Sequence, residues 1–232
     1  MWILVLYALA GVINLTVEYF TCDIARYISK IALMPLLMLY LFQQTKKIKS
    51  FKFVYAALFF SWLGDIFLMF PRASYNAQVA QNLFIAGLVS FLIAHVNYII
   101  SFLKEINKQN RVSLIVEKPY LILPFLLYLF LLLCFLFPSL GVMKVPVFIY
   151  GVCITLMLIF AFNRKNLVIK KSFYLVFTGA ILFILSDSLI AIDVFYQKME
   201  WHRTAIMLTY IIAQYLIIEG IIKAYKSTTK DV

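Results

Sequence analysis

Long apolar runs separated by short polar stretches cover almost the whole chain. A bilayer core about 30 Å thick is crossed by about twenty apolar residues of α-helix, and runs of that length recur from one end to the other. The pattern predicts an all-α, polytopic membrane helical bundle that forms a single integral membrane domain over 1–232. The expected spans are 1–18, 24–42, 53–70, 80–103, 119–137, 142–162, 173–195 and 203–224.

Prolines mark several ends of these spans, as proline does where a helix stops. Pro35 and Pro124 instead fall inside two of the runs, where a proline removes one backbone hydrogen bond. We therefore expect kinks in the second and fifth spans.

The charge pattern gives an orientation. Only 13% of the residues are charged, whereas 65% are hydrophobic. Fifteen of the twenty-one Lys and Arg fall in the connections on one side of an eight-span arrangement, together with both chain ends. By the positive-inside rule both termini are expected in the cytoplasm, and the setting we expect is a bacterial inner membrane. The net charge of +11 then reflects topology and attraction to anionic lipids, so no nucleic-acid partner is expected.

Two carboxyl groups interrupt the apolar runs. Asp65 and Asp187 lie in the third and seventh spans, where a charge costs at least a few kcal/mol and usually has a functional reason. Counting from the cytoplasmic start of each span at 1.5 Å per residue puts them at depths of about 18 Å and about 21 Å. Similar depths are what a facing pair requires. The alternative is two separate polar groups, each bonded to a neighbouring helix.

The spacing of the two acids suggests a duplication. Each Asp lies in the third span of a four-span half, so the halves 1–110 and 111–232 would be parallel repeats. The sequence identity between the halves is slight, and chance similarity stays an alternative.

Other polar residues inside the spans are candidates for the walls of a polar cavity. Lys30 either reaches the membrane surface with its long side chain or pairs with an acid or a lipid phosphate. The intramembrane histidine His95 has no second histidine near it in any span, and neither CxxC nor zinc-ligand spacing occurs, so no metal is expected. The remaining candidates are Tyr98, Tyr150, Ser186, Tyr210 and Gln214.

Four strings of the chain follow one another in a distinctive order. They are SWLGDIFLM at 61–69, FLIAHVNY at 91–98, GAILFILSDSLIA at 179–191 and TYIIAQYLI at 209–217. Two surround the acids, one carries a His–Tyr step, and one a Tyr–Gln step. Over about residues 25–220 this ordered set resembles the YhhN-like lysoplasmalogenase family, and Lys30 and Pro35 are similar to a Lys–Pro segment in the family's second helix.

This resemblance implies an eight-helix membrane enzyme that hydrolyses the vinyl ether bond of lysoplasmalogen. The products would be a fatty aldehyde and glycerophosphoethanolamine or glycerophosphocholine, and no metal or organic cofactor is implied. A pair of carboxyl groups suits this chemistry, because one can donate a proton while the other activates water. On this hypothesis Asp65 and Asp187 are catalytic. The substrate-binding residues would be Lys30, His95, Tyr98, Tyr150, Ser186, Tyr210 and Gln214.

Three other functions fit parts of the pattern. Paired acids and parallel repeats also suit a proton-coupled transporter of small molecules or lipids. An intramembrane aspartyl protease is disfavoured, because Trp62 stands where such enzymes have the first glycine of a Gly-x-Gly-Asp pattern. A lipid-binding member of the fold without activity is the third. The partners expected are a lysophospholipid and membrane lipids, and the sequence leaves the oligomeric state open.

Overall fold

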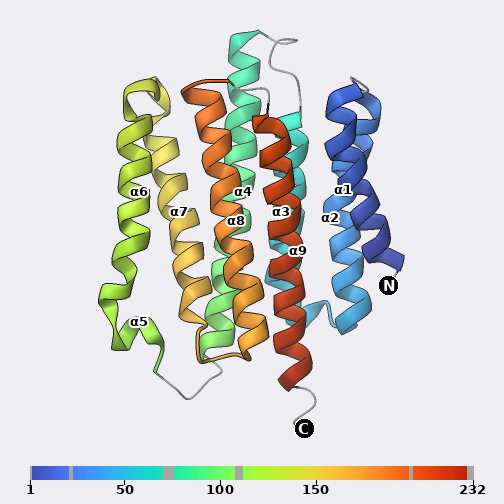
Figure 1. Ribbon diagram of the computed structural model, residues 1–232, viewed down its shortest axis with the longest axis vertical. Coiled ribbons are helices and arrows are strands. Elements are labelled where there is room, and N and C mark those ends of the chain that lie inside the picture. Colours follow the sequence, from blue (N-terminus) through green and yellow to red (C-terminus); the bar gives the residue numbers. More distant parts are fainter. Residues whose placement is uncertain (1, 21–22, 70–75, 108–111, 199–200, 229–232) are drawn as a thin grey trace. The chain divides into compact units, whose positions relative to one another are not determined.

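The computed structural model describes residues 2–20, 23–69, 76–107, 112–198 and 201–228 (Figure 1). In these ranges the chain forms helices and turns, and no strand. The α-helices are α1 (Trp2–Phe20), α2 (Asp23–Thr45), α3 (Lys52–Met69), α4 (Ala77–Asn107), α5 (Leu114–Glu117), α6 (Leu123–Leu136), α7 (Lys144–Asn163), α8 (Lys170–Phe195) and α9 (His202–Thr228).

Seven helical segments in the described ranges are long and apolar enough to cross a membrane, which confirms the helical membrane bundle. They correspond to the second to eighth predicted spans. The first helix, α1, is apolar over Trp2–Val17 and is not among these seven. Whether the first helix also crosses the membrane, and with it the side on which each terminus lies, stays a prediction.

Of the two prolines expected to kink a span, Pro124 instead lies at the start of a helix. Pro124 lies in the first turn of α6, directly after a 3₁₀ segment at Pro119–Ile122, so it begins the α-helix instead of bending it. This is where proline costs little, because the first-turn N–H groups have no partner within the helix. Pro35, in contrast, lies inside the continuous helix α2.

The chain divides into two compact units, Met1–Tyr98 and Ile99–Val232, and the division falls within α4. In the first unit α2 packs against both α1 and α3. A polar contact joins the first two helices, since the Asn14 side-chain amide donates to Ser29 Oγ at 3.1 Å. The repeat halves proposed from the sequence stay a prediction.

The second unit is organised by the long contact between α8 and α9, which run side by side in Figure 1. Gly179 makes this approach possible. A Cβ atom at position 179 would lie 2.9 Å from the Ala213 carbonyl oxygen and 3.0 Å from the Ile217 backbone nitrogen. Small residues serve the same purpose at many helix contacts in membranes, because packing and not the hydrophobic effect holds the helices together there.

A fully buried arginine ties three helices of this unit together. Arg164 follows the end of α7, and its guanidinium donates to Glu105 Oε2 on α4 at 2.7 Å and to Ser172 Oγ on α8 at 2.9 Å. The same guanidinium lies 5.4 Å from the centre of the Phe102 ring. A buried charge requires such partners, since leaving it uncompensated costs several kcal/mol.

Substituting Gly179 by alanine is expected to lower the melting temperature of the detergent-solubilised protein. The new methyl would meet backbone atoms that cannot move aside, and overpacking of this kind costs about 1–3 kcal/mol. Gly151→Ala is the control, because its methyl would meet only the ends of two flexible leucine side chains, Leu129 at 3.0 Å and Leu133 at 4.0 Å. Equal melting temperatures for the two variants would contradict the close approach of α8 and α9.

Candidate functional site

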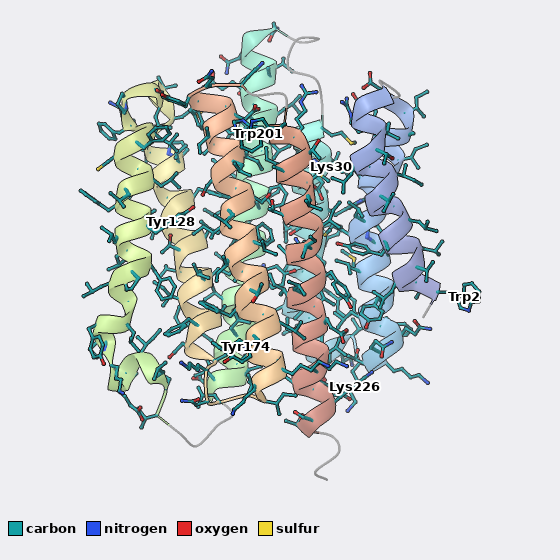
Figure 2. The ribbon with its side chains drawn as sticks, viewed as in Figure 1. Trp2, Lys30, Tyr128, Tyr174, Trp201 and Lys226 are labelled. Atoms are coloured by element: carbon teal, nitrogen blue, oxygen red, sulfur yellow. The ribbon has the colours of Figure 1, made fainter. Side chains whose placement is uncertain are left out.

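Asp65, in the first unit, is a carboxyl group buried next to a cation. Its side chain on α3 is 3% exposed, and Lys30 Nζ from α2 lies 3.5 Å from Asp65 Oδ1. Lys30, labelled in Figure 2, is only 17% exposed. Its side chain thus pairs with an acid, which is one of the alternatives considered for this lysine.

Trp62 and Gly64 fix how α3 meets its neighbours beside Asp65. The Trp62 indole N–H donates to the Ile31 carbonyl of α2 at 3.0 Å. A Cβ at Gly64 would lie 2.5 Å from the Phe91 ring of α4, so glycine is required here for packing. The acid is thereby held on a helix whose position is fixed by contacts on two sides.

Three further polar side chains of the first unit are buried. Tyr7 of α1 is buried and close enough to Asp65 and Tyr98 for electrostatic interaction with both. The predicted residues His95 and Tyr98 are fully buried on α4. Tyr7 was not among the predicted site residues, because aromatic residues are common throughout membrane helices.

Asp187 is the corresponding buried acid of the second unit. It lies on α8, and the Tyr150 hydroxyl of α7 donates a hydrogen bond to its Oδ2. The structure thus joins two of the predicted site residues directly. The tyrosine comes from a different helix, so the carboxyl group is positioned by the packing of α7 on α8.

A second tyrosine holds the residue after the acid. The Ser188 hydroxyl bonds to the Ile184 carbonyl at 2.7 Å and lies 2.7 Å from the Tyr128 hydroxyl of α6. A serine has one hydroxyl hydrogen, so if Ile184 receives it, Tyr128 is the donor to Ser188. Tyr128, labelled in Figure 2, therefore links α6 to α8 next to Asp187.

The remaining predicted residues of this unit line the contact between α8 and α9. Ser186 is buried and donates to the Ile206 carbonyl of α9 at 3.0 Å. Tyr210 and Gln214, four residues apart on α9, are both buried, and the Tyr210 ring packs edge-on against Phe183 at 5.5 Å. Their role in binding a substrate stays a prediction.

Two polar pairs away from the acids were not anticipated. By its place in the sequence, Arg164 looks like an ordinary charge in a connection between spans, yet it is buried against Glu105. His202 is buried with its Nδ1 atom 3.3 Å from Asp193 Oδ1. Neither pairing has a signal in the sequence, because the partners are brought together only by helix packing. Within the described ranges no group of three or more His, Cys, Asp or Glu side chains is arranged to hold a metal ion.

Comparison with known proteins gives one match. The family model described as the YhhN family matches residues 25–221. No curated protein and no solved structure matches the chain. The matched range contains both acids, Lys30 and Tyr150.

Replacing Lys30 by methionine is expected to destabilise the protein by about 1–3 kcal/mol, because it removes the ammonium group from beside a buried carboxylate. The double variant Lys30→Met/Asp65→Asn should recover part of this loss, since both charges are then absent. Lys52→Met is the matched control, because Lys52 is exposed on the same unit. Thermal unfolding in detergent measures all three, and a Lys30→Met melting temperature equal to the control would contradict the ion pair.

Proposed function

The chain belongs to the YhhN family, and from this premise we propose that it is a membrane hydrolase that cleaves the vinyl ether bond of lysoplasmalogen. The observation that carries the proposal is that each of two buried carboxyl groups is held by a polar side chain of another helix. Asp65 is beside Lys30, and Asp187 accepts a hydrogen bond from Tyr150. Ionisable groups at such depth are expensive and typically functional.

The proposed reaction needs one proton donor and one proton acceptor. The acid protonates the outer carbon of the alkene, which leaves an oxocarbenium ion. Water adds to that ion while the base accepts its proton, and the resulting hemiacetal collapses to a fatty aldehyde and the glycerophospho alcohol. Glycosidases stabilise a similar oxocarbenium-like state with two carboxyl groups. We propose that Asp65 and Asp187 supply the two functions.

The other polar residues would bind the substrate. Lys30 carries the positive charge that a lipid phosphate needs, while Tyr150 orients the Asp187 carboxyl group. The remaining candidates lie on helices that carry an acid or pack against one that does, and all are buried, which supports a role in positioning the headgroup and water. They are His95, Tyr98, Ser186, Tyr210 and Gln214. The substrate is a lysophospholipid of the surrounding membrane.

The charge distribution supports a location for this activity. Because most Lys and Arg fall in alternate connections, we propose that the protein lies in a bacterial inner membrane with both termini in the cytoplasm. A lysophospholipid would then reach the protein from the bilayer itself.

Replacing either acid by asparagine is expected to lower aldehyde release from lysoplasmalogen by about 10²–10⁴-fold, the usual contribution of a general acid or base. If both groups serve one reaction, the Asp65→Asn/Asp187→Asn variant should be no slower than the more damaging single variant. The assay uses purified protein in detergent, with Asp193→Asn as a control outside the proposed machinery. Full activity in either single variant would remove that residue from the mechanism.

The purified protein should cleave lysoplasmalogen and leave its saturated alkyl ether analogue intact. The saturated ether has no alkene carbon to protonate, so the route through the oxocarbenium ion is closed. Product analysis by mass spectrometry distinguishes the two lipids. Cleavage of both, or of neither, would contradict vinyl ether chemistry.

A proton-coupled transporter is the second candidate, and the Lys30–Asp65 ion pair is the observation that favours it. Such pairs also occur in membrane proton relays. Uptake into proteoliposomes that depends on a proton gradient, without aldehyde formation, would support transport over hydrolysis.

A further inference from the structure

Pro35 leaves one backbone carbonyl of α2 without its usual partner. In an α-helix the N–H of residue 35 would bond to the carbonyl of residue 31, but proline has no N–H. The Ile31 carbonyl is therefore free within its own helix. In a bilayer core no water is available to bond it, and neighbouring helices must do so.

Trp62 supplies the missing donor. Its indole N–H lies 3.0 Å from the Ile31 carbonyl oxygen, and the indole nitrogen can donate but not accept. The ring is also held by a neighbour on α3, since the Phe59 ring centre lies 6.0 Å away. The contact is thus a side chain of α3 in the place of a hydrogen bond that α2 cannot make.

The position of this contact links it to the candidate acid. Ile31 directly follows Lys30, and Trp62 precedes Asp65 by three residues, so the Trp62–Ile31 bond joins the same two helices as the ion pair. The 3.5 Å separation of Lys30 Nζ and Asp65 Oδ1 leaves little room for a shift, because attraction and hydrogen bonding both weaken with distance.

We propose that Trp62 is a positioning residue for the Lys30–Asp65 pair. By bonding the carbonyl that Pro35 frees, its indole N–H holds α2 and α3 in the register at which the ammonium group meets the carboxyl group. The consequence for catalysis rests on the function proposed above, whereas the consequence for the ion pair does not.

The test is a cycle of Trp62→Phe and Pro35→Ala. Phenylalanine keeps an aromatic ring but removes the donor, whereas alanine at position 35 restores the N–H that can bond to Ile31 within α2. We expect Trp62→Phe to lower kcat for lysoplasmalogen about tenfold or more, with a smaller change in KM, since misplacement of about 1 Å can cost up to about a hundredfold. In the Pro35→Ala background, the factor by which Trp62→Phe lowers kcat should be at least fivefold smaller. Trp2→Phe is the matched control, because Trp2 is 81% exposed and projects away from its helix in Figure 2.

A second measurement is independent of activity. Lys30→Met should lower the melting temperature of the wild-type protein clearly more than that of the Trp62→Phe variant, because the ion pair is already displaced in the latter. In the Trp62→Phe/Pro35→Ala variant, Lys30→Met should again lower the melting temperature by about as much as it does in the wild-type protein.

The outcomes separate the two proposals. An inactive wild-type protein would overturn the proposed hydrolysis, while the melting temperatures would still decide the role of Trp62. An equal fall in kcat in both backgrounds, or an equal effect of Lys30→Met in all of them, would show that the indole acts only by filling space and would overturn the positioning role. Wild-type kcat in Trp62→Phe would overturn it as well.

Discussion

The lack of hydrogen-bonding partners in lipid is the constraint on which the rest of this structure depends. Each polar group in a span must find a partner on its own helix or on another one, because the bilayer core offers none. Asp65 has Lys30, Asp187 has Tyr150, and the Ile31 carbonyl has Trp62. These few polar contacts specify which helix faces meet, since an apolar face packs almost as well against lipid as against another helix.

The sequence predicted the fold class and most of the helices, because a helix that crosses lipid needs about twenty mostly apolar residues. It predicted helix ends less well. The helix α4 extends to Asn107 and α8 begins at Lys170, so both include polar residues beyond the apolar runs. Helical hydrogen bonding does not stop where hydrophobicity does, since water at the membrane surface tolerates polar side chains on a helix. The start of α6 at Pro124 is not visible in the sequence, because the 3₁₀ turn before it is as apolar as the α-helix that follows.

The candidate site was predictable where a residue is unusual for its setting. Asp65, Asp187 and Lys30 stand out as charges in apolar runs, so composition alone selects them. Tyr7, Tyr128 and Trp62 do not stand out, because aromatic residues are common throughout membrane helices. Their roles depend on which helices are neighbours, and that information is absent from periodicity. The link between Pro35 and Trp62 is an intermediate case, since the sequence shows the missing donor but not its replacement.

The buried Arg164 has a consequence for biosynthesis. Its charge partner Glu105 lies 59 residues earlier in the chain and is therefore made before it. Ser172 comes 8 residues later, in the first turn of α8, so the full set of partners requires only the start of that helix. A truncated chain that ends before α8 would keep the ion pair with Glu105 but lack the Ser172 hydroxyl. One N–H group of the guanidinium would then need another acceptor, which a bilayer core does not offer.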